Sequence, residues 1–166
     1  MPEPAKYYGK YRGTVVTNTD PEQRGRIQAQ VPDVVGDTSS SWALPSVPQV
    51  GHFVLPPIGA GVWIEFEQGD KSYPIWSGCW WGSSSEMPSL GLAGTPDQPN
   101  MVLQTQGERT IVLSDLPGGP GITLKTSDGA KIEINDTGIT IDNGKGAKIS
   151  LVGKNVNIND GALTVT

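Results

Sequence analysis

Residues 101–166 repeat one short pattern, in which two apolar side chains are separated by a single residue. Turn sequences such as SDG, NDTG and NDG lie between the pairs. Side chains at i and i+2 share one face of a strand, so the pattern predicts a series of short strands with one apolar face. The pairs are Met101/Leu103, Ile111/Leu113, Ile122/Leu124, Ile132/Ile134, Ile139/Ile141, Ile149/Leu151, Val156/Ile158 and Leu163/Val165.

Two apolar side chains per strand make a stripe too narrow for one copy of the chain to bury. Burying one such side chain contributes about 1.5–3 kcal/mol, whereas ordering each residue costs about 1–2 kcal/mol in backbone entropy. Three copies wound together could turn their stripes inward and pair each strand with a strand of a neighbouring copy, which would remove the open edges. The lack of any aromatic residue in 101–166 suits a narrow axis.

The pattern therefore predicts an intertwined, trimeric, triangular β-helix (a β-prism) with a dry axis. With one layer per strand, eight layers give a length of about 38 Å at about 4.8 Å per layer. The residues predicted to line the axis are Ile122, Leu124, Ile132, Ile134, Ile139, Ile141, Ile149, Leu151, Val156 and Ile158.

Residues 1–82 differ, because they hold all five Trp, all four Tyr and both Phe. Short apolar runs between turn signals predict about five strands, which suit a small barrel, and no window has a convincing helical period. In VWIEFE, Val62, Ile64 and Phe66 share one face. The predicted strands are Tyr11–Thr17, Gly25–Val31, Gly51–Leu55, Val62–Glu67 and Ile75–Trp80.

The fold class expected for the whole chain is all-β, which the 22 Gly and 14 Pro favour because both residues interrupt helices. Residues 83–100 are rich in Ser, Pro and Gly and are interpreted as a linker. The expected organisation is an N-terminal arm at 1–12, a five-stranded barrel at 13–82, the linker at 83–100 and the β-prism at 101–166.

Composition also excludes several classes of protein. One cysteine, Cys79, cannot form an internal disulfide, and with one histidine, His52, the chain cannot supply a Cys/His zinc site. The net charge of −5 opposes binding of duplex nucleic acid. The sequence has no apolar run long enough to cross a membrane and no secretory signal at its start. We therefore expect no enzyme activity, no metal and no cofactor.

The spaced motif N-x-D-P-x-x-x-G-R-I, followed later by G-D and P-x-x-x-G, resembles the OB-fold domain of phage baseplate assembly protein V and VgrG-type central spikes. Residues 101–166 resemble the β-helical needle that follows this domain in such spikes. The motif residues that carry the resemblance are Asn18, Asp20, Pro21, Gly25, Arg26, Gly69, Asp70, Pro74 and Gly78.

This resemblance implies a homotrimeric, membrane-piercing spike of a contractile injection apparatus, assembled in the bacterial cytoplasm as part of a phage tail or a phage-tail-like particle. It implies that the OB domain docks on a trimeric hub at the end of the inner tube and that the needle points outward. The lysozyme domain and the His-x-His iron site of some relatives are absent. A separate PAAR-type tip protein is expected to contact Leu163, Val165 and Thr166.

Three alternatives stay open: a receptor- or glycan-binding tail-tip adhesin, an OB-type ligand-binding module and a cell-wall hydrolase. Trp76, Trp80 and Trp81 could stack on bases or sugars, although core and subunit packing is the interpretation we adopt. Glu65 and Glu67 are interpreted as a solvated strand face rather than a hydrolytic pair. His52 is interpreted as a packed or surface residue and Cys79 as a small, buried hydrophobic residue. Arg24 and Arg26 could pair with acidic neighbours or with the hub, and the sequence leaves this open.

Overall fold

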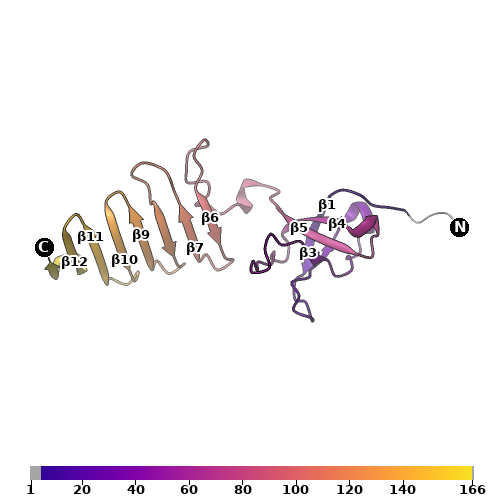
Figure 1. Cartoon of the computed structure of the whole chain (residues 1–166), viewed down its shortest axis with the longest axis horizontal. Helices are drawn as coiled ribbons and strands as arrows, with labels where there is room; N and C mark the ends of the chain where they lie inside the picture. The colour runs from indigo at the N-terminus through magenta and orange to yellow at the C-terminus, as the bar shows by residue number, and fades with distance from the viewer. Residues whose placement is uncertain (1–4, 166) are drawn as a thin grey trace. The chain divides into compact units, whose positions relative to one another are not determined.

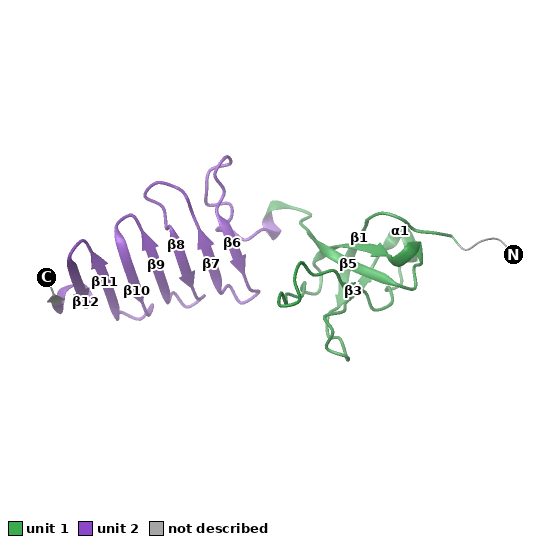
Figure 2. Cartoon of the chain, in the orientation of Figure 1, with its two compact units in different colours: residues 1–84 green, residues 85–166 purple. Residues whose placement is uncertain are grey.

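The computed structural model describes residues 5–165, with only the backbone described for Thr164 and Val165. The chain divides into two compact units, Met1–Ser84 and Ser85–Thr166 (Figure 2). Strands form the regular structure of both units, apart from helical segments of three or four residues. The expectation of an all-β protein is therefore confirmed for the described residues.

Unit 1 is built on a five-stranded sheet with the order β2-β1-β4-β5-β3 (Figure 1). Neighbouring strands are antiparallel except for β3 and β5, which are parallel. An isolated bridge between Ile27 and Ala43 links the β2 edge to the segment entering β3, so the sheet curls back on itself. The strands are β1 (Tyr11–Thr17), β2 (Gln28–Gln30), β3 (Leu44–Pro45), β4 (Gly61–Phe66) and β5 (Pro74–Trp80).

The core of unit 1 follows the alternation of β4, whose Val62, Ile64 and Phe66 all point inward and are buried. Val15 of β1 and Ile27 complete the centre of this core. Because one face of a curled sheet encloses a small volume, a few β-branched and aromatic side chains fill it.

One predicted strand of unit 1 is wrong. Residues 51–55 form an irregular loop, in which the consecutive side chains of Phe53 and Val54 are both exposed, so the alternation that a half-buried strand requires is missing. The fifth strand is instead β3. Helix α1 (Pro32–Val35) was not predicted, although Pro at its start and Gly36 after its end are ordinary helix boundaries.

Unit 2 is a single antiparallel meander of eight strands, β6 to β13, in which each strand pairs with the next along the chain (Figure 1). Every predicted apolar pair lies in one of these strands, which confirms the strand predictions for 101–165. The strands are β6 (Met101–Gln104), β7 (Thr110–Leu113), β8 (Ile122–Lys125), β9 (Lys131–Asn135), β10 (Gly138–Asp142), β11 (Lys148–Val152), β12 (Asn155–Ile158) and β13 (Leu163–Val165).

The expectation that strands pair with those of neighbouring copies is wrong for β7 to β12. Each of these strands is hydrogen-bonded on both edges to strands of its own chain, which leaves no ladder free for another copy. An i, i+2 pattern states which face of a strand is apolar but not which strand lies beside it. Strand pairing through β7 to β12 therefore cannot hold copies of this unit together.

Tight turns allow this meander. The turn at 136–137 joins β9 to β10, and the side-chain oxygen of Asn135 accepts hydrogen bonds from the backbone N–H groups of Thr137 and Gly138 at 3.0 and 3.3 Å. Gly138 also packs so closely on the next strand that an added Cβ would lie 2.0 Å from the carbonyl oxygen of Leu151. A glycine is required there for the strands to approach.

Residues 85–100, interpreted from the sequence as a linker, belong to unit 2 and are folded rather than extended. The backbone N–H of Gly91 donates to the carbonyl oxygen of Pro88 at 2.8 Å, and the side-chain amide of Asn100 donates to Leu90 at 2.9 Å. These bonds give residues 85–100 a series of turns within unit 2.

Candidate assembly surface

The most unusual surface of the molecule is one face of the unit 2 sheet, here called the aliphatic face. It consists of the two aliphatic side chains that each of strands β6 to β12 presents on that side, together with Leu163 of β13. Cross-strand register aligns them in two columns about 7 Å apart: for example, Ile141 lies opposite Ile132 on one side and Ile149 on the other. The first column runs Met101, Leu113, Ile122, Ile134, Ile139, Leu151 and Val156, and the second runs Leu103, Ile111, Leu124, Ile132, Ile141, Ile149, Ile158 and Leu163.

These aliphatic side chains are exposed in the protomer. Their exposed fractions range from 37% for Ile139 to 65% for Met101 and Leu103, while Val156 and Ile158 are half-buried. On the opposite face of the same sheet, by contrast, Val112 and Thr123 are 2% and 5% exposed. A soluble protein rarely leaves a continuous apolar strip of this kind uncovered, so the aliphatic face marks an interaction surface.

Charged groups are kept off the aliphatic face. Lys131 and Glu133 form an ion pair of 2.7 Å on the opposite face of β9. Lys148 pairs with Asp160 at 2.9 Å, and this hydrogen bond raises the pKa of the lysine above its ordinary value. Covering the aliphatic face would therefore remove no charge from water, so the burial would not carry the desolvation penalty of an ionic interface.

In unit 1, the motif residues Asp20 and Arg26 form the centre of a hydrogen-bonded turn. The side chain of Asp20 is buried and accepts hydrogen bonds from the backbone N–H groups of Glu22, Arg24 and Arg26 at 3.0, 2.8 and 3.3 Å. The Arg26 guanidinium donates to the same carboxylate, with its terminal nitrogen 2.7 Å away. These bonds hold the pKa of Asp20 well below its usual range.

Arg24 and Arg26 both pair with acidic side chains of the same turn. Arg26 pairs with Asp20 and Glu22 and lies over the Trp42 ring at 5.5 Å, while Arg24 pairs with Glu22. The three backbone bonds to one carboxylate shape the turn that leads into β2, which explains why β2 begins later than predicted.

The remaining motif positions also lie at turns and strand ends rather than in one cluster. Asn18 donates its side-chain N–H to the carbonyl oxygen of Pro56 at 3.0 Å. Asp70 accepts a hydrogen bond from the Ser72 backbone N–H at 2.9 Å, and this bond lowers its pKa. The other positions are Pro21, Gly25, Gly69, Pro74 and Gly78, of which Gly25, Gly69 and Pro74 are buried.

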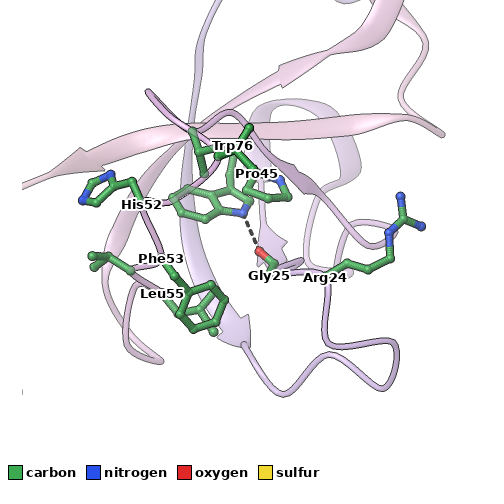
Figure 3. A pocket seen from close by; sticks show the side chains of 10 residues that line it. Arg24, Gly25, Pro45, His52, Phe53, Leu55 and Trp76 are labelled. Atoms are coloured by element: carbon green, nitrogen blue, oxygen red, sulfur yellow. Dashed lines mark hydrogen bonds between the residues drawn. The ribbon is translucent and has the colours of Figure 1, made fainter.

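The tryptophans have three different environments. Trp76 is 7% exposed and donates its indole N–H to the carbonyl oxygen of Gly25 at 3.1 Å (Figure 3), so it belongs to the core. Trp80 is half-buried and donates to Val62 at 3.1 Å, and Arg12 lies 5.2 Å from its ring centroid. Trp81 is exposed. The three side chains therefore do not form one stacking platform.

The two glutamates do not act as a pair, because β4 ends at Phe66 and Glu67 begins the short η1 helix (Glu67–Gly69). Glu65 forms an ion pair with Lys10 and accepts a hydrogen bond from the Ser77 hydroxyl at 2.8 Å. The lysine and serine bonds lower the pKa of Glu65, as expected of a structural ion pair rather than a general acid.

His52 and Arg24 lie on opposite sides of a shallow, mainly apolar hollow of about 150 Å³ (Figure 3). Its floor includes Pro45, Phe53 and Trp76. Cys79 was expected to be buried, but the residue as a whole is exposed. Its sulfur is still partly shielded from water, which raises the pKa of the thiol above its ordinary value, so the thiol is protonated at neutral pH. Cys79 does not line this hollow, and the groups that line it beside His52 include no carboxylate, hydroxyl or thiol side chain that could act with the imidazole in nucleophilic catalysis.

Residues 5–165 contain neither a metal-binding cluster nor a membrane-spanning helix. No three His, Cys, Asp or Glu side chains in this part of the chain are grouped to hold a metal ion. None of its helices has the length and apolar character needed to span a bilayer.

Comparison with known proteins matches both units. Residues 11–81 match the type VI secretion system/phage-baseplate injector OB domain, and residues 100–164 match the phage baseplate V C-terminal trimerisation domain. No curated protein matches the chain. The two family matches cover about four fifths of the sequence, and both families are structural baseplate families rather than enzyme families. The chain therefore belongs to the phage baseplate V family, with an injector OB domain followed by a C-terminal trimerisation domain.

Proposed function

We propose that the protein is the homotrimeric central spike of a contractile injection apparatus. The observation that carries this proposal is the aliphatic face, whose side chains are exposed in the protomer and free of charge. Its residues lie within 100–164, the region that matches a trimerisation domain. Three such faces turned inward would bury their side chains around one axis and form a triangular prism.

In this proposal each sheet is one wall of the prism. Six aliphatic side chains, two from each copy, meet at each level of the axis. Ile132, Ile141 and Ile149 illustrate the result, since consecutive strands place isoleucines at neighbouring levels of one column. The strands lie across the axis and their hydrogen-bond ladders run along it, so the walls are continuous in the direction of load.

The resulting function is mechanical. Contraction of the sheath supplies force, and a stiff, narrow prism concentrates that force on a target membrane. We propose that the OB domain docks on the trimeric hub of the inner tube, that the prism points outward, and that the particle is assembled in the bacterial cytoplasm. A PAAR-type tip protein would cover the end that bears Leu163; Thr166 lies outside the described residues, and the side chain of Val165 is not described.

Immunogold electron microscopy of the contractile particles tests this function. Antibodies against the purified protein should label the baseplate end of the tube, and particles from cells without the gene should lack the label and fail to kill or inject. Labels along the sheath, or active particles without the protein, would contradict the proposal. A matched strain carrying Ile141→Asp separates loss of trimer assembly from loss of the whole protein.

A further inference from the structure

The margins of the unit 2 sheet are not strands but two rows of turns. Because consecutive strands pair and reverse direction, the turns alternate between the two margins (Figure 2). Residues 105–109, 126–130, 143–147 and 159–162 form the first margin, and residues 114–121, 136–137 and 153–154 form the second.

The turns of the first margin support one another. A Cβ added at Gly144 would lie 2.7 Å from the carbonyl carbon of Gly129, so the turns at 126–130 and 143–147 are in close contact. The side-chain oxygen of Asn159 accepts a hydrogen bond from the Lys148 backbone N–H at 2.9 Å, which connects the last turn of this margin to β11. The margin is therefore an ordered edge that can present side chains at fixed heights.

Rotational symmetry dictates which margins meet. In a closed ring of three copies every interface joins two different surfaces, and all copies stand at the same height. A wall that faces inward meets one neighbour along its first margin and the other neighbour along its second. Resting on the trimer proposed above, we infer that the first margin of each copy docks on the second margin of the next copy, with Asp136 paired to Lys145 and Lys154 paired to Asp160 across each corner.

The heights of the turns allow this pairing. The turn holding Asp136 lies between β9 and β10, and the turn holding Lys145 lies between β10 and β11, so the two differ by one strand spacing, about 4.8 Å. Lys154 lies between β11 and β12, one spacing from Asp160 between β12 and β13. Turns of the two margins therefore interleave at each corner.

Opposite charges lie one strand spacing apart at Asp136 and Lys145 and at Lys154 and Asp160. The same interleaving also brings Asp128 within one spacing of Asp136 and Lys145 within one spacing of Lys154. Asp136, Lys145 and Lys154 are all exposed, and within residues 5–165 none of them forms an ion pair. Asp160 is already paired with Lys148 of its own chain, and Lys154 would bring a second cation to it. An exposed ion pair contributes little stability, so these contacts would not drive assembly.

Cysteine cross-linking of the full-length protein tests the inference. In a Cys79→Ser background, Asp136→Cys is combined with Lys145→Cys and treated with a short bis-maleimide. Denaturing electrophoresis should show covalent dimers and trimers. Each single substitution should give none, because neither margin meets its own kind. Asp136→Cys with Gln106→Cys is the matched control, since these turns differ by three strand spacings, about 14 Å.

The outcomes separate this inference from the proposed function. A trimer by light scattering that gives no cross-links, or cross-linked dimers from Asp136→Cys alone, would overturn the assignment of the corners and leave the trimer intact. A monomeric Cys79→Ser protein would overturn the proposed function and the corners together. Thr137→Cys with Lys145→Cys joins the same two turns, so it repeats the test without removing the Asp136 side chain.

Discussion

Ile141 lies directly opposite Ile132 across the ladder between β10 and β9, and both side chains face solvent in the protomer, at 45% and 39% exposure. Aliphatic side chains that lie opposite each other on a sheet usually pack together into a hydrophobic core. The described residues of unit 2 place no second layer over this face, and the same relationship continues from strand to strand. In the proposed trimer, the sheets of the other two copies would cover this face.

The first prediction concerns charge on this surface. Ile141→Asp places three carboxylates on the proposed axis, where each would lose its hydration, so the variant should be monomeric at concentrations at which the wild type is trimeric. Light scattering measures this directly. Ser150→Asp is the matched control, because Ser150 lies on the opposite face of the neighbouring strand β11. A stable Ile141→Asp trimer would show that the aliphatic face does not turn inward.

The second prediction concerns close packing between hairpins. Gly138→Ala drives a Cβ into the Leu151 carbonyl group, so strands β10 and β11 must separate and unit 2 should lose stability by several kcal/mol, roughly the range of severe substitutions. Gly146→Ala has a similar backbone cost, with φ at +98°, but open space around the new methyl group. It should cost about 1–2 kcal/mol. Chemical denaturation followed by circular dichroism compares the two, and equal losses would refute the close approach.

The third prediction concerns the carboxylate that organises the motif of unit 1. Asp20→Asn keeps the size of the side chain but removes its charge and replaces one of its two acceptor oxygens by an NH2 donor. Arg26 and the three backbone N–H groups can then no longer all donate to this side chain. Unit 1 should lose several times more stability than it does in Glu22→Gln, whose side chain is exposed. All five tryptophans lie in unit 1, so their fluorescence reports its unfolding. Equal effects of the two substitutions would argue against the central role of Asp20.

The fourth prediction is the pH dependence of the same site. Folding lowers the pKa of Asp20 from 3.8, so its ionised form stabilises the folded state above that pH, and this contribution is lost as the pH falls through the folded value. The free energy of unfolding of unit 1, followed by tryptophan fluorescence, should therefore change little through Asp20 between pH 7 and about pH 4. Below about pH 4 it should decrease. The Asp20→Asn protein should have a shallower acid slope, and an unchanged slope would assign the acid sensitivity to other carboxylates.

The sequence predicted the faces of the strands better than their partners. The i, i+2 pattern placed Ile132 and Ile134, for instance, on one face of β9, because side-chain direction depends only on local backbone geometry. Strand pairing depends on the length and rigidity of turns, and the turns at 136–137 and 153–154 are tight enough to return the chain onto itself. The expected pairing between copies was therefore replaced by a meander within one chain.

Unit 1 shows the same limit. Residues 51–55 have a composition typical of a strand, yet Phe53 and Val54 lie in an exposed loop, while the two-residue strand β3 is too short to leave a periodic signal. Asp20 and Arg26 were visible as motif residues, but their direct contact was not, because a spacing of six residues has no fixed meaning in a turn. Local patterns indicate faces and boundaries, whereas contacts that depend on loop geometry require the structure.

The central claim is that three aliphatic faces close around one axis, and the native mass of the purified full-length protein tests it most directly. Light scattering across a dilution series should give a species at three times 17.6 kDa that persists on dilution and in moderate denaturant. A species that stays at 17.6 kDa at every concentration would contradict the claim, because the aliphatic face would then be stable in water without a partner.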